Sequence, residues 1–323
     1  MITILPFICL AAGAVINWKG LPKRVLDFID IIINISVVML MVVIGLNIGI
    51  NETVIKSLPT IGLNCVLICW ISIAFSVLFS VIFEKKFLQL DKLKEQLSIA
   101  GKIESVLLKD EDASKESQNS SPLIVVIPVS IIVGLIMGVI FFDDSISEVL
   151  NVCLMICLTL LYTGVGISLA SNKSVFSYIK QLGVKLLLLP VAVFLGCGFG
   201  GILSCIILKL PPEIAVVSAG GMGYYSITGS FMMQTYGVLE GTYGFIVNVM
   251  REFFTVLFLP FLVKISKGSA IVSGAAGDMD TMLVPVTKMV GEELSVIVII
   301  TGTVLTIITP FWLPAMVTIL GIL

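Results

Sequence analysis

Histidine is absent from this sequence, and charged side chains are scarce. Lysine, arginine, aspartate and glutamate together make up 12% of the 323 residues. Histidine is the commonest general base and metal ligand, and no nucleophile with a neighbouring base or cofactor motif takes its place. We therefore expect neither an enzyme nor a protein with a resident cofactor or a transition-metal site.

The seven cysteines lie in apolar runs and imply no disulfide framework. Cys65 and Cys69 share a helix face, as do Cys153 and Cys157, but no histidine or nearby acid completes a metal-ligand set. We interpret them as small buried side chains. The net charge of −2 is the sum of separated loop charges, so we expect no nucleic-acid partner.

Hydrophobic residues, in contrast, make up 58% of the chain, and the mean hydropathy is +1.15. This composition predicts an all-α integral membrane protein. The first apolar run lacks the basic leading region of a signal peptide, so it is interpreted as a membrane helix. The predicted spanning runs are 1–16, 26–46, 61–83, 123–141, 149–170, 182–208, 243–263 and 294–320.

Two segments among these runs, 215–236 and 270–290, are too polar and too rich in glycine for plain membrane helices. Irregular backbone at membrane depth survives only where protein or a water-filled cavity surrounds it. We therefore predict eight transmembrane helices plus two re-entrant hairpins that enter from opposite faces. The positive-inside rule places both termini outside and the linker 84–121 in the cytoplasm.

Internal repeats accompany this layout. One constant offset aligns 45–51 with 166–172 and also pairs Gly13 with Gly134 and Gly62 with Gly183. A repeated three-helix unit must run in the opposite sense the second time, which makes it an inverted repeat.

A second repeat lies in the last third, where 215–219 resembles 270–274 and Leu259-Pro260 recurs as Leu313-Pro314. A hairpin and the following helix therefore recur as a unit. The predicted divisions are a three-helix repeat (1–83), a charged cytoplasmic linker (84–121), the inverted second repeat (122–210), the first hairpin with its helix (211–264) and the second hairpin with its helix (265–323).

Ionisable residues at membrane depth are functional candidates because burying their charge is costly. We single out Arg251 and Glu252 in the seventh helix and Asp278 and Asp280 in the second hairpin. Adjacent helical residues point about 100° apart, so we assign at least one of Arg251 and Glu252 to a cavity. Carboxylates and freed carbonyls near Ser273 can coordinate Na⁺ or carry a proton.

Glycines favour the tight turns and close backbone approach of a hairpin tip. The first hairpin adds hydroxyl groups that can bind a substrate, and no Lys-Ser/Thr follows its glycines, so a phosphate-binding loop is excluded. The tip glycines are Gly221, Gly223, Gly274 and Gly277, and the hydroxyl groups belong to Tyr225, Ser226 and Thr228.

Three motifs carry a resemblance: 221–226, Asn248 with Arg251-Glu252, and 276–281. Together, in order and spacing, they resemble the lysine exporter (LysO) family of bacterial inner-membrane proteins. The resemblance implies export of L-lysine and its toxic analogue thialysine, with intramembrane acids that transport requires. Glu252 matches one such acid, and Glu52 is the best match for a second acid near the end of the second helix. The sequence after Thr281 and the long linker depart from the family pattern.

These observations predict a secondary active exporter that works by alternating access and H⁺ or Na⁺ antiport, in contact with the lipid bilayer; a homodimer is also considered. The predicted substrate-binding residues are Glu252, Asp280, Ser226, Tyr225, Asn248 and Thr228. The predicted ion-coupling residues are Asp278, Asp280, Glu252, Ser273 and Glu52, with Na⁺ at the hairpin tips as one form of coupling. Two alternatives stay open: a sodium-coupled carboxylate or glutamate symporter, in which Arg251 holds the substrate, and a gated channel or membrane sensor controlled by the linker.

Overall fold

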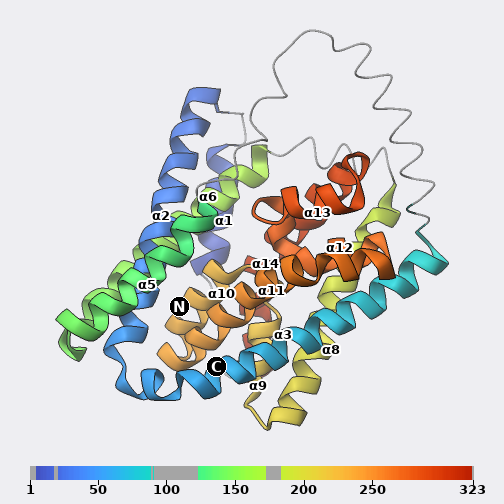
Figure 1. Cartoon of the computed structure of the whole chain (residues 1–323). Helices are drawn as coiled ribbons and strands as arrows, with labels where there is room; N and C mark the ends of the chain where they lie inside the picture. Colours follow the sequence, from blue (N-terminus) through green and yellow to red (C-terminus); the bar gives the residue numbers. More distant parts are fainter. Residues whose placement is uncertain (1–4, 18–20, 89, 91–122, 172–182, 322–323) are drawn as a thin grey trace.

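The computed structural model describes residues 5–17, 21–88, 90, 123–171 and 183–321, and over these residues the chain is helical without strands (Figure 1). Most of the predicted linker lies outside the described residues. In chain order the helices are α1 (Leu5–Ile16), α2 (Lys23–Ile50), α3 (Glu52–Lys86), α5 (Leu123–Phe141), η1 (Asp144–Ile146), α6 (Ser147–Ser171), η2 (Val184–Leu187), α8 (Leu188–Leu208), α9 (Pro212–Ala219), α10 (Tyr225–Thr235), α11 (Val238–Ile265), α12 (Lys267–Gly274), η3 (Ala275–Met279), α13 (Leu283–Val290), η4 (Glu292–Leu294) and α14 (Ser295–Ile319).

Each of the eight apolar runs forms a helix. Among the described residues, six helices are long and apolar enough to cross a membrane, in α2, α3, α6, α8, α11 and α14. This confirms an all-helical, multi-pass membrane protein. Helices α1 and α5 are shorter apolar helices, so the count of eight crossings stays a prediction.

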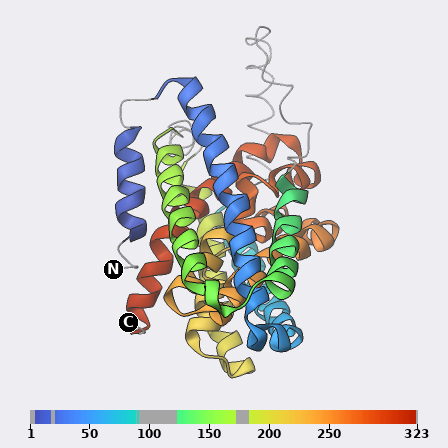
Figure 2. The same ribbon diagram turned by 90° about the vertical axis from the view of Figure 1, so that its left-hand side faces the viewer.

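The long helices form two blocks. In the first block α2 packs along α5 and against α6, and α1 packs along α6. In the second block α3 packs along α8. Helices α9, α11 and α12 pack against α3, α14 packs against α8, and α10 and α13 pack against α11. The first block lies on one side of the molecule in Figure 1, and Figure 2 shows the molecule from that side, with these helices toward the viewer.

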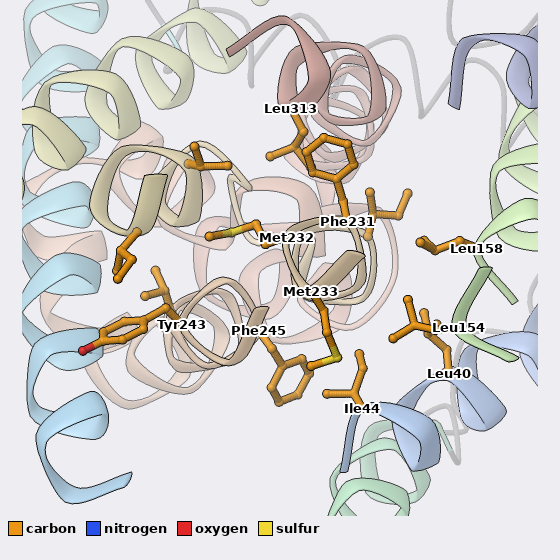
Figure 3. Close-up of a cluster of buried hydrophobic side chains, with 14 of the residues drawn as sticks. Leu40, Ile44, Leu154, Leu158, Phe231, Met232, Met233, Tyr243, Phe245 and Leu313 are labelled. Carbon is orange, nitrogen blue, oxygen red and sulfur yellow. The ribbon is translucent and has the colours of Figure 1, made fainter. Parts of the chain in front are cut away.

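Short helix α10 joins the two blocks through the hydrophobic core. Figure 3 shows its side chains among residues of α2 and α6 on one side and of α11 and α14 on the other. The labelled residues of this cluster are Leu40, Ile44, Leu154, Leu158, Phe231, Met232, Met233, Tyr243, Phe245 and Leu313. This packing holds α10 in place. The first residue of α10, Tyr225, directly follows the irregular backbone that separates α10 from α9.

The two glycine-rich segments are helices interrupted by irregular backbone. In the first, α9 ends at Ala219 and α10 begins at Tyr225. In the second, α12 ends at Gly274, the 3-10 turn η3 follows, and α13 begins at Leu283. The breaks lie where the sequence predicts hairpin tips. Entry from opposite membrane faces and the inverted repeat stay predictions.

Candidate functional site

The two breaks meet each other. We call residues 220–224 tip one and residues 275–282 tip two. The backbone N–H of Ala276 in tip two donates a 3.0 Å hydrogen bond to the carbonyl of Met222 in tip one. Met222 (φ 51°) and Ala275 (φ 53°) both have left-handed backbone, which is uncommon for residues with a side chain. Strained backbone of this kind clusters at functional sites.

Helix α11 supports tip one through Asn248. Its amide oxygen accepts a 2.7 Å hydrogen bond from the N–H of Gly223, and its amide nitrogen donates to the carbonyl of Ser218 at 2.9 Å and to that of Gly244 at 2.7 Å. Ser218 lies in the last turn of α9, where carbonyls lack helical partners. Gly221 packs closely against Asn248 and Thr228, so a side chain there would collide with this support.

The same helix supports tip two through Arg251. Its guanidinium donates to the carbonyls of Ser273 at 3.1 Å and Val272 at 2.9 Å, at the end of α12. It also contacts the hydroxyl of Ser76 in α3 and the sulfur of Cys197 in α8. Arg251 is 3% exposed. Among the described residues it forms no salt bridge, so its charge is balanced by carbonyl dipoles rather than by a carboxylate partner.

Glu252, one residue further along α11, has different surroundings. One of its carboxylate oxygens accepts a 2.9 Å hydrogen bond from the hydroxyl of Thr281 in tip two. The same oxygen lies over Gly277, where a side chain would crowd it. Glu252 also lines a cavity, whereas Arg251 is not among the residues that line it. The neighbouring charges of α11 thus have separate places, one in the helix packing and one at the cavity.

The cavity has a volume of about 340 Å³ and lies between the two blocks. The first block contributes residues of α2 and α6, and the second contributes both tips, α11 and α14. The polar side chains in its lining are Asp30, Asn34, Tyr225, Ser226, Glu252, Asp280, Thr281, Thr303 and Thr306, with the Tyr224 ring also part of the wall. Among the described residues that line it, three are acidic and none is lysine or arginine.

The structure brings four of the predicted substrate-binding residues to the cavity: Glu252, Asp280, Ser226 and Tyr225. The other two lie behind it. Asn248 supports tip one, and Thr228 is buried in the first turn of α10, where its hydroxyl donates to the carbonyl of Tyr224 at 2.7 Å.

The predicted ion-coupling residues are more scattered. Ser273 is buried at the end of α12, and its carbonyl accepts hydrogen bonds from Arg251 and Thr255. Asp278 is 0% exposed, and neither of its carboxylate oxygens has a hydrogen-bond partner among the described residues. Its carboxylate lies directly against Gly274.

Glu52 lies away from both tips. It occupies the first turn of α3, its side chain is 84% exposed, and it forms a 2.8 Å salt bridge with Lys56. It is not among the residues that line the cavity. The chain turns at Asn51 between α2 and α3, and Glu52 lies on the surface at this turn, outside the site.

Asp30 lines the cavity but is not among the predicted site residues. It lies in α2, within the apolar run 26–46, so the signal was available: it is an acid inside a predicted membrane helix. Asn34 lies one helical turn further along and also faces the cavity.

Comparison with known proteins agrees with the motifs. A family model described as lysine exporter LysO matches residues 128–317, which include both tips and α11. The lysine exporter LysO of Escherichia coli K12 is 28% identical over 153 residues, which are 47% of this chain and 51% of that protein. A putative lysine exporter of Haemophilus influenzae is 27% identical over 161 residues, which are 50% of this chain and 81% of that protein.

The match thus spans about half the length of the Escherichia coli relative. No solved structure matches the chain. Because the family model covers more than half of the sequence and contains every element that builds the two tips, the chain belongs to the LysO lysine exporter family.

Proposed function

We propose that this protein is a secondary active exporter of L-lysine and close analogues such as thialysine, in the bacterial inner membrane. Two relatives bear the name of lysine exporter, and the family is one of transporters rather than enzymes. The matched region includes tip one, tip two and α11, and it contains 16 of the 20 residues that line the cavity.

The observation that carries the proposal is the charge of the cavity. Asp30, Glu252 and Asp280 face it, and no lysine or arginine is among the described residues that line it. Lysine has two ammonium groups and one carboxylate, so it brings net positive charge to this wall. Ammonium groups and carboxylates form hydrogen bonds roughly twice as strong as neutral ones. An acidic cavity therefore selects for a cationic amino acid.

The polar groups suggest how lysine is oriented. Glu252 or Asp280 receives the side-chain ammonium group, and Asp30 on the opposite block receives the α-ammonium group. The hydroxyls of Ser226 and Tyr225 bind the α-carboxylate at the start of α10. The N-terminus of a helix carries positive partial charge and free N–H groups, which favour a carboxylate there.

The position of the cavity between two blocks supports alternating access. Asp30 lies on one block and Glu252 and Asp280 on the other, so lysine held between them links the blocks. Rocking of one block against the other then exposes the same site to each side of the membrane in turn. Antiport with H⁺ or Na⁺ supplies the driving force, and the homodimer stays a prediction.

A sodium-coupled carboxylate symporter fits the cavity less well. Its anionic substrate requires a cation, and Arg251 was the sequence-based candidate. The guanidinium of Arg251 is instead hydrogen-bonded to the end of α12 and does not line the cavity. Three carboxylates would also repel an anion.

Counterflow in proteoliposomes tests the proposal without knowledge of the coupling ion. Vesicles loaded with unlabelled lysine should transiently accumulate labelled lysine, and thialysine should compete. Removing one charged partner, in Glu252→Gln or Asp280→Asn, should weaken apparent lysine affinity by about 10-fold or more. Asp143→Asn, which changes an exposed acid outside the cavity, is the matched control.

Near-normal counterflow in both cavity variants would contradict the assigned roles. Counterflow of glutamate or a dicarboxylate in place of lysine would contradict the substrate.

A further inference from the structure

One buried acid is not explained by lysine binding. Asp278 lies in η3 between Gly277 and Met279, both of which line the cavity. Asp278 itself is fully buried and is not part of the lining. Its carboxylate lies against Gly274, at the end of α12, so it is separated from the cavity by the backbone of tip two.

Backbone encloses this carboxylate closely. A side chain at Gly274 would overlap one of its oxygens, and Gly302 of α14 packs against the backbone between Asp278 and Met279. No described group donates a hydrogen bond to either oxygen. The carboxylate is therefore tightly packed and has no hydrogen-bond donor among the described residues.

An ionised carboxylate in such a place is very unfavourable. Transfer of an unpaired charge into an apolar interior costs so much that the group is usually neutralised instead. The buried cation of this region, Arg251, uses its donors on the carbonyls of Val272 and Ser273 and forms no salt bridge among the described residues. A proton neutralises the carboxylate without further ligands, whereas Na⁺ needs several additional oxygens.

Because charged residues lie near Asp278, its protonation depends on whether a cation occupies the cavity. Arg251 of α11 favours the ionised form of Asp278, whereas Glu252 of α11 and Asp280 of tip two oppose it. Helix α14 carries no charged residue, and the basic residues of α12 and α13 are Lys267 and Lys288. With the cavity empty, the negative charges of Glu252 and Asp280 oppose a third one beside them. An ammonium group bound to them removes that opposition.

We propose that Asp278 is the proton-coupling site of this exporter. The proposal rests on the proposed lysine export. Asp278 holds a proton while the tips are packed together around an empty cavity. When lysine binds from the cytoplasmic side, the O–H bond of Asp278 breaks, the proton passes to cytoplasmic water as the tips move, and the carboxylate remains. After lysine leaves on the other side, a proton from that side binds again, so one lysine leaves for each proton that enters.

Comparison of exchange with gradient-driven transport tests this role. Lysine–lysine exchange returns the carrier loaded with lysine and needs no proton, whereas net transport does. In proteoliposomes, an acidic interior should drive accumulation of labelled lysine by the wild type and by Asp143→Asn. The exchange rate of Asp278→Asn should stay within about 3-fold of the wild-type rate, whereas its gradient-driven accumulation should fall by about 10-fold or more.

Three results would overturn the proposal. The first is gradient-driven accumulation that persists in Asp278→Asn. The second is a correctly inserted Asp278→Asn protein that loses lysine exchange as well as gradient-driven accumulation. The third is transport that a Na⁺ gradient drives and a pH gradient does not. Absence of lysine exchange in the wild type would instead refute the proposed function, on which this role depends.

A spectroscopic measurement covers the case in which Asp278→Asn folds poorly. Infrared difference spectra of the wild type on addition of lysine should lose the carbonyl band of a protonated carboxyl group. Asp278→Ser should lack that change, and Asp143→Asn should keep it. A band that persists in Asp278→Ser would assign the proton to another acid.

Discussion

The left-handed residues of the two tips store strain at single positions. Ala275 has a φ of 53° and Met222 a φ of 51°, and the hydrogen bond that joins the tips runs from the N–H of Ala276, next to Ala275, to the carbonyl of Met222. A left-handed residue with a Cβ costs roughly 1–2 kcal/mol. The surrounding contacts must hold these residues in place.

Ala275→Gly should therefore stabilise the protein. Glycine adopts left-handed backbone without the Cβ penalty, although it also makes the unfolded chain more flexible, so we expect a net gain of about 0.5–1 kcal/mol. The melting temperature in detergent checks this. The control, Ala74→Gly in the regular helix α3, should have the opposite sign, and a loss of stability in both variants would contradict the assigned strain.

Arg251 and Glu252 should respond differently to conservative replacement. Arg251→Lys removes the planar fork that reaches two carbonyls, so we expect a loss of about 2–3 kcal/mol in stability together with a loss of transport. Glu252→Gln keeps the size of the side chain and should weaken apparent lysine affinity by about 10-fold or more while its melting temperature changes little. Thermal unfolding and counterflow, measured on both variants, distinguish the two roles, and equal destabilisation would contradict them.

Gly274 and Asp278 should be energetically coupled. Gly274 has ordinary right-handed helical backbone, so Gly274→Ala is harmful only because the new methyl group overlaps the Asp278 carboxylate. In an Asp278→Ala background the same change should cost little. The double-mutant cycle in melting experiments should therefore give a coupling energy of about 1 kcal/mol or more. Additive effects would indicate that the collision is avoided in another way.

The acidic residues show which parts of the site can be predicted from the sequence and which cannot. Glu252 and Asp280 were identified because an acid within a membrane segment is costly without a function. Asp30 carries the same signal but was overlooked in its long apolar run. Glu52 was chosen by resemblance to a family position, but Asn51 is the N-cap of α3, so Glu52 lies in the exposed first turn of that helix and pairs with Lys56.

At the scale of elements, glycines set the packing of the first block. Gly45 of α2 lies against the backbone of α5 near Gly134, and Gly13 of α1 lies against the backbone of α6 near Gly166. Small residues allow membrane helices to approach this closely. The offset that aligns the two predicted repeats maps Gly45 onto Gly166 and Gly13 onto Gly134. It therefore maps one contact pair onto the other, with the two helices of each pair exchanged. An inverted repeat requires this reciprocity, and it stays a prediction until tested.

Gly134→Val should separate α5 from α2, because its side chain would overlap the backbone of Val42. We expect a destabilisation of about 2–4 kcal/mol, typical of overpacking against backbone that cannot move aside. The control is Gly198→Val in α8, where a Cβ meets nothing within 4 Å. Melting temperatures in detergent should differ clearly, and similar values would contradict the close packing.

Helix boundaries were predicted well where hydropathy decides them. The eight apolar runs and the two breaks all correspond to elements of the structure. The start of α11 was placed too late, at residue 243 rather than Val238, because Glu240 and two glycines obscure its first turns. Residues 183–187 were placed in the run 182–208, but α8 begins at Leu188 after the 3-10 turn η2.

For the whole molecule, the sequence did not predict which helices share a block. Hydrophobic periodicity gives the existence of a membrane helix, but its partners depend on close contacts between small residues far apart in the chain. The cavity follows from that assembly, since α2 and α6 contribute one wall and the tips, α11 and α14 contribute the rest.

The position of the cavity predicts an asymmetric accessibility. Asn34 lies on α2, whose first residue follows the loop that the positive-inside rule places in the cytoplasm. In a variant without native cysteines, Asn34→Cys should react with a membrane-impermeant thiol reagent from the cytoplasmic side, and lysine should slow the reaction. Leu78→Cys, an exposed position on α3, should show no protection by lysine. Labelling from the outer side alone would reverse the predicted orientation.

Three residues within one short stretch of α11 have different roles: Asn248 binds tip one, Arg251 binds the end of α12 beside tip two, and Glu252 faces the cavity. A change at Asn248 or Arg251 is expected to disturb both the packing of a tip and the cavity beside it, so this stretch has little freedom to evolve. Asp30 and Asn34 on α2 face the same cavity from the opposite block. New substrate preferences should therefore arise most readily through α2, which makes it the natural target for directed evolution of an exporter with a different amino-acid range.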